Sequence, residues 1–149
     1  MAPADPAASV PVAKGIVGKA VGRYVAFHRF NVDGSAYGGL IGPVNDAVRF
    51  LCLHLNAGLV NGTRLLSAEA VTAMQRITAT GPKLDVGLGW FRERSDRTSA
   101  PQHLEHLGGG AGFWNDMRIY PDERVGVVSM GNATSYDHRR LLSAVQRLS

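Results

Sequence analysis

The first half of the chain shows the hydrophobic spacing of helices. Apolar residues recur at the i, i+3, i+4 and i+7 positions within residues 43–58, and Ser67 and Glu69 suit the start of a second helix through about Ile77. These signals predict two helices that sit side by side, joined by a short hairpin-like link at Asn61-Gly62. Pro43 suits the first position of the first helix, and Gly58 lies where its C-terminal cap is expected. Ser67 is the predicted N-cap of the second helix.

After Gly81-Pro82 the pattern changes to the alternation that is typical of half-buried strands. Strands are predicted around residues 86–90 and 103–107, along Phe113 to Tyr120, and from residue 124 to residue 130. Their short connections imply antiparallel neighbours, since a parallel pair needs a long crossover. A closing amphipathic helix is predicted from Leu141, Val145 and Leu148. The expected fold class is α+β, an antiparallel sheet of three to four strands packed by helices.

Residues 1–33 are predicted to stand apart from the α+β part at residues 34–149. Ala, Pro, Ser and Val dominate residues 1–12, which indicates a flexible lead-in. From Ala13 to Arg29 the apolar and basic residues separate onto two sides of a helical wheel. This predicts an amphipathic basic helix that packs on the body of the protein. A more specific interpretation is that this helix binds a membrane surface or an acidic partner.

Length and charge narrow the function classes. A chain of 149 residues matches one domain. The net charge of +4 is spread over residues of mixed sign, which gives weak support for a nucleic-acid partner, and none is predicted. There is no apolar run of about 20 residues and no leader pattern, so a cytoplasmic protein is expected by default. The lone Cys52 is predicted to be a small buried residue. Only three of the 16 cationic residues are lysines: Lys14, Lys19 and Lys83.

The densest group of special residues runs from His103 to Phe113 and includes a glycine run. In a strand, His103 and Glu105 share one face and His106 the other, so at most two of them can reach one ion. No metal and no other cofactor is therefore predicted. The glycines lack the Lys-Ser/Thr pair of a phosphate-binding loop. A structural interpretation stays open, in which the glycines interrupt the strand as a bulge or allow close backbone approach.

Six segments occur in an order and spacing that resemble one family, the serine β-lactamase and penicillin-binding-protein-like hydrolases, in their class C β-lactamase and esterase branch. The segments are Tyr37-Gly38-Gly39-Leu40, Asn45-Asp46-Ala47-Val48-Arg49-Phe50, Asn61-Gly62-Thr63-Arg64-Leu65-Leu66-Ser67, Gly87-Leu88-Gly89-Trp90, His106-Leu107-Gly108-Gly109 and residues 125–132. The resemblance covers residues 34–149 and implies the C-terminal part of a β-lactamase/transpeptidase-like fold.

The resemblance also implies roles for the glycine segment. His106-Leu107-Gly108 matches the His-x-Gly form of the family's strand beside the active site. Gly109 falls where the family uses a backbone N–H as half of its oxyanion hole. His106 and Gly109 are therefore the predicted catalytic residues. Leu107, Gly108 and Gly110 are the predicted substrate-binding residues.

The family's first two catalytic elements are missing from this sequence. The nearest match to the nucleophile motif Ser-x-x-Lys is Thr80-Gly81-Pro82-Lys83, whose Gly and Pro preclude a helical turn. No Tyr-x-Asn or Ser-x-Asn occurs. The resemblance then implies a hydrolase fragment that is inactive alone. It would act on an ester or β-lactam-like molecule when completed by an N-terminal chain or in a homo-oligomer.

Two other function classes remain as hypotheses. The same sheet, without the rest of the family's fold, would expose an edge that pairs with another chain. The protein would then be a non-catalytic interaction module or a remnant of the fold. A membrane-surface protein that docks through residues 13–29 is the less favoured hypothesis.

Overall fold

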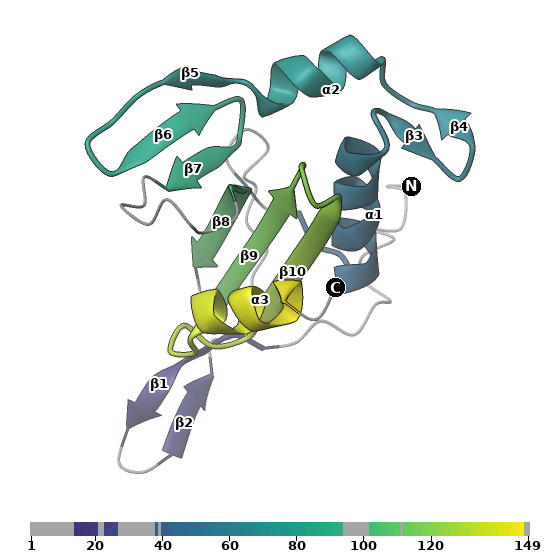
Figure 1. The fold of residues 1–149 in the computed structure, drawn as a ribbon. Coiled ribbons are helices and arrows are strands. Elements are labelled where there is room, and N and C mark those ends of the chain that lie inside the picture. The colour runs from purple at the N-terminus through teal and green to yellow at the C-terminus, as the bar shows by residue number, and fades with distance from the viewer. Residues whose placement is uncertain are drawn as a thin grey trace, which may run out of the picture.

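The computed structural model describes residues 14–20, 23–26, 38, 40–93, 102–110 and 112–147. The predicted lead-in at residues 1–12 lies outside these residues. So do the predicted boundary between residues 33 and 34 and Leu148 of the closing helix. Within the described residues, three helices surround a central sheet (Figure 1).

The central sheet has six strands in the order β10-β9-β8-β7-β6-β5, and every neighbouring pair is antiparallel (Figure 1). The strands are β5 (Ile77–Ala79), β6 (Leu84–Gly87), β7 (Phe91–Glu93), β8 (Leu104–Gly110), β9 (Phe113–Tyr120) and β10 (Val125–Gly131). The predicted α+β class and antiparallel pairing are confirmed. The predicted three to four strands were too few. One reason is that the predicted strand over residues 86–90 is in fact the end of β6 and the tight turn that leads into β7, with Gly89 at φ +78°.

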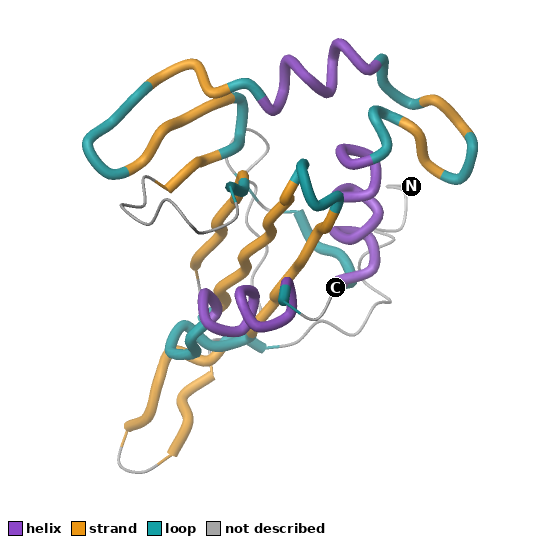
Figure 2. The backbone as a smooth tube through the Cα atoms, in the orientation of Figure 1, coloured by secondary structure: helices purple, strands orange, loops and turns teal. Residues whose placement is uncertain are grey.

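The two predicted helices in the first half of the chain are present as α1 (Val44–Leu55) and α2 (Ala68–Gln75). Ser67 Oγ accepts a hydrogen bond from Ala70 N at 3.1 Å, as its predicted capping role requires. The link between the helices is a hairpin of β3 (Leu59–Val60) and β4 (Thr63–Arg64), traced in Figure 2. The helices are not side by side along their lengths. They meet at their C-terminal ends, where Gln75 Nε2 lies 3.3 Å from His54 Nδ1 (Figure 1).

Strand β9 carries both halves of the core because its successive side chains point to opposite faces of the sheet. On one face α1 packs against β9 and β10, and Leu51 joins Ile119, Trp90 and Leu104 in a buried cluster. On the other face the closing helix α3 (His138–Gln146) packs against the same two strands. That second cluster consists of Leu142, Tyr120 and Val127. The expectation that a closing helix covers the sheet is confirmed.

The predicted basic helix over residues 13–29 is wrong. The structure has two strands there, β1 (Ile16–Ala20) and β2 (Arg23–Ala26), which pair as an antiparallel hairpin. Gly15 and Gly18 weaken a helix, and β-branched residues such as Val17 favour extended backbone. Ile16 N donates to the oxygen atoms of Asn132 and Gly112, which joins the hairpin to the central sheet. The membrane-docking hypothesis therefore lacks the amphipathic helix on which it was based.

The helices also bury faces other than the predicted ones. Cys52 is exposed, because it points away from the face of α1 that buries Leu51, Leu53 and His54. In α3 the buried residue is Leu142, whereas Leu141 and Val145 are 49% and 45% exposed. The face of α3 that packs on the sheet is therefore displaced from the predicted Leu141 and Val145 stripe.

The end of α1 places an alanine where a glycine is favoured. Gly58 N donates to Leu53 O at 2.8 Å, but the residue directly after the cap, Ala57, takes the left-handed φ of +50°. We expect Ala57→Gly to raise the free energy of unfolding by about 1 kcal/mol, measured by urea denaturation. The matched control, Ala73→Gly within α2, should lower it by about 0.5–1 kcal/mol. A loss of stability in both variants would contradict the assignment.

Candidate functional site

The five predicted site residues lie together on strand β8, where the strand extends past its pairing with β7 and, among the described residues, has a free edge. Strand β8 pairs with β9 along its whole length, from Leu104↔Ile119 to Gly110↔Phe113. It pairs with β7 only through Phe91↔Glu105. Among the described residues, positions 106–110 therefore have no strand partner on the β7 side. The predicted interruption of the strand at the glycine run is wrong, because β8 continues through Gly110.

His106 is held at the start of this edge by the turn between β6 and β7. Its Nδ1 lies 2.6 Å from the backbone oxygen of Gly89. Its ring stacks on Phe91, with ring centroids 5.8 Å apart and an interplanar angle of 16°. The position of His106 therefore depends on Gly89 and Phe91, two residues that sequence reasoning did not connect with it.

The three glycines of the site differ in what surrounds them. A Cβ atom at Gly109 would collide with the indole ring of Trp114, its direct partner on β9. A Cβ atom at Gly108 or Gly110 would meet nothing within 4 Å. Packing on Trp114 thus accounts for glycine at one position only. The backbone at the other two borders open space, where a ligand can lie against the strand.

The expected division of the polar residues between the two faces of β8 is confirmed. His103 Nε2 lies 3.8 Å from Glu105 Oε2, on the face that α3 covers. His106 is on the opposite face, beside Phe91. In the part of the chain that the structure describes, no three His, Cys, Asp or Glu side chains converge as metal ligands would.

A buried charged cluster lies beneath α3, and sequence reasoning assigned it no role. Arg118 lies between two fully buried carboxylates, with its Nε 3.3 Å from Glu105 Oε2 and its Nη2 3.2 Å from Asp116 Oδ2. His138, at the start of α3, places Nδ1 2.7 Å from Asp116 Oδ2. The alternation along β9 put Asp116 and Arg118 on one face but gave no sign that α3 would bury that face.

The two carboxylates of this cluster differ in acidity. Burial favours the neutral form of Glu105, but a polar contact from His103 and the charges of Arg118 and Arg139 outweigh it and lower its pKa. Burial dominates at Asp116 and raises its pKa, despite the contacts from His138 and Arg118. The stabilisation from Glu105 is therefore present at neutral pH and lost as the pH falls. Ionised Asp116 instead disfavours folding at neutral pH, and this cost disappears as the pH falls and the carboxylate is protonated.

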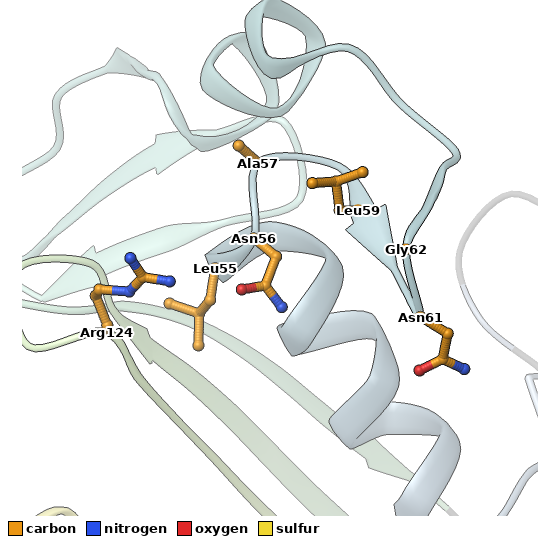
Figure 3. A pocket seen from close by; sticks show the side chains of 7 residues that line it. All are labelled: Leu55, Asn56, Ala57, Leu59, Asn61, Gly62 and Arg124. Carbon is orange, nitrogen blue, oxygen red and sulfur yellow. The ribbon is translucent and has the colours of Figure 1, made fainter.

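Two hollows in the surface lie elsewhere. The larger, about 440 Å³, opens between the end of α1, the β3–β4 hairpin and the turn before β10 (Figure 3). Its lining residues are Leu55, Asn56, Ala57, Leu59, Asn61, Gly62 and Arg124. The smaller, about 210 Å³, is lined by Gln75, Arg92, Gln102, His103, Leu104, Pro121 and Asp122. Neither is lined by residues 106–110, so the candidate site is an open strand edge and lies outside both hollows.

The nearest match to a nucleophile motif is not presented on a helix. Thr80 and Lys83 belong to the loop between β5 and β6, as the Gly and Pro between them predict. Within the described ranges, no helix is both long enough and apolar enough to cross a bilayer.

The α+β class and the antiparallel sheet packed by helices match the fold that the sequence resemblance implied. A family model described as Beta-lactamase matches residues 2–148. The chain belongs to the beta-lactamase family. No curated protein and no solved structure matched the chain.

Proposed function

We propose that this chain supplies the oxyanion and substrate strand of a serine hydrolase of the class C β-lactamase and esterase branch, and that it is inactive alone. The single observation that carries the proposal is the free edge of β8. There the family's His-x-Gly segment has no strand partner among the described residues, and the glycines at 108 and 110 border open space.

The edge suits acyl transfer because negative charge develops on the acyl oxygen in the transition state. In an antiparallel strand, alternate residues direct their backbone N–H groups to opposite sides, so a free edge offers N–H donors to a ligand. A fixed donor of this kind can lower the barrier by about 2.7–4 kcal/mol. Gly109 is the proposed donor. His106 is the proposed side chain beside the acyl group, with Leu107, Gly108 and Gly110 as the surface along which the substrate lies.

The nucleophile must come from outside this sequence in this proposal. There is no Ser-x-x-Lys in the chain, and the nearest match, at residues 80–83, lies in a loop. We propose that an N-terminal complementing chain of the same family, carrying Ser-x-x-Lys and Tyr-x-Asn, provides the missing groups. A homo-oligomer is the second form of partner. The proposed substrate is an ester or a β-lactam-like molecule.

Complementation tests this function. The purified chain is assayed with a chromogenic cephalosporin and a short-chain nitrophenyl ester, alone and after mixing with an N-terminal half from a family member. We expect no turnover by either half alone and turnover by the mixture. Turnover by the chain alone would contradict the proposal, as would an inactive mixture in which the two halves are shown to bind each other.

A second function is supported by the same edge. An unpaired strand is a template for pairing with another chain, so the protein would be a non-catalytic interaction module. This function predicts a stable complex with a partner strand and no turnover in any mixture. The complementation assay therefore separates the two functions.

A further inference from the structure

The carbonyl oxygen of Gly89 determines which nitrogen of His106 carries the proton. A backbone carbonyl can only accept a hydrogen bond, and His106 Nδ1 lies 2.6 Å from it. Nδ1 must therefore be the donor in this contact. A neutral imidazole has one N–H, so when Nδ1 carries it, Nε2 keeps a lone pair and can only accept.

The fold holds this carbonyl in place. Gly89 lies in the tight turn between β6 and β7, where Gly87 N donates to Trp90 O at 2.8 Å. Its φ of +78° is one that a residue with a side chain adopts only with strain. Phe91 begins the next strand and stacks on the His106 ring, which limits rotation of the ring away from the turn. The turn and the stacked ring together select one orientation of the imidazole.

We infer that His106 offers Nε2 to the substrate as a hydrogen-bond acceptor and that Gly89 and Phe91 are its positioning residues. This inference rests on the proposed function and names a substrate class for it. A substrate carboxylate also only accepts, so it would meet Nε2 lone pair to lone pair. The site therefore suits acyl esters that are uncharged beside the acyl group, or that carry an N–H or O–H there. Acyl compounds with a carboxylate at that position are disfavoured.

The tautomer is measured on the isolated chain by ¹⁵N NMR of labelled histidine at about pH 8, where imidazole is ordinarily neutral. We expect a protonated, pyrrole-type Nδ1 and an unprotonated, pyridine-type Nε2 for His106. Gly89→Ala, which strains the turn, should shift His106 toward the other tautomer. The matched control is Gly62→Ala, because Gly62 has φ +79° and the same free space but lies in the β3–β4 hairpin. It should leave the His106 signals unchanged.

A protonated Nε2 in the unaltered chain would overturn the inference, and so would equal effects of the two glycine variants. Because this measurement needs no turnover, its failure is distinct from failure of the proposed function. In an active mixture, the ratio of ester turnover to turnover of the carboxylate-bearing cephalosporin is the measure of preference. This ratio should be at least about tenfold higher with the unaltered chain than with His106→Lys. A His106→Lys mixture with unchanged preference would overturn the substrate class.

Discussion

Replacing Arg118 with methionine is expected to lower the free energy of unfolding by about 3–5 kcal/mol. The guanidinium lies 3.3 Å from Glu105 and 3.2 Å from Asp116, and all three side chains are buried between the sheet and α3. Removal of the guanidinium leaves two buried carboxylates without the positive charge that lies between them. Since a domain is stable by about 5–15 kcal/mol in total, the loss should be visible as a large shift of the urea midpoint.

The matched control is Arg49→Met, which breaks the exposed pair of Arg49 with Asp46 on α1. Its side chains are 68% and 56% exposed, so we expect a loss of no more than about 0.5 kcal/mol. Adding Glu105→Gln and Asp116→Asn to Arg118→Met should restore part of the lost stability, because the uncompensated charges are then gone. If Arg118→Met costs as little as Arg49→Met, the buried cluster does not stabilise this fold.

His106→Ala is expected to lower the turnover of the reconstituted enzyme by about 100-fold or more. The side chain lies at the free edge of β8, held there by Gly89 and Phe91, and truncation removes the Nε2 lone pair that can accept a proton beside the acyl group. Initial rates with the nitrophenyl ester at equal concentrations of both halves measure the effect. His106 is half-buried, so circular dichroism should show that the variant remains folded.

The control for this variant is Lys83→Ala. Lys83 is the nearest lysine to a nucleophile motif in sequence, yet it lies in the loop between β5 and β6. We expect its replacement to leave turnover unchanged. A loss of turnover in Lys83→Ala together with full activity in His106→Ala would place the catalytic machinery elsewhere on the chain.

Hydrophobic periodicity predicted the elements whose buried side chains follow a single helical or strand spacing. Strand β9 was predicted with its observed bounds because Phe113 to Tyr120 alternates between two covered faces. The β6–β7 hairpin was missed because Gly87-Leu88-Gly89-Trp90 alternates in size as a strand does, although Gly89 turns the chain. The N-terminal hairpin was missed because amphipathic spacing outweighed the glycines in that interpretation.

The motif located the candidate site, but its surroundings depend on strand register. His106 and Gly109 were predicted from the His-x-Gly segment and lie at the free edge of β8. The contact of His106 with Gly89 joins strand β8 to the turn between β6 and β7, and Gly109 packs on Trp114 only because those residues pair across β8 and β9. The burial of Glu105 depends on where α3 lies. No local pattern in the sequence contains these relationships.

The most direct test of the central claim is intact-mass measurement after treatment with a serine-directed fluorophosphonate. The chain alone should gain no adduct, because the nucleophile is proposed to lie outside it. In the mixture, a stoichiometric adduct should form on the serine of the partner's Ser-x-x-Lys, and this chain should still carry none. A stoichiometric adduct on any serine of this chain would contradict the claim that it contributes only the oxyanion and substrate strand.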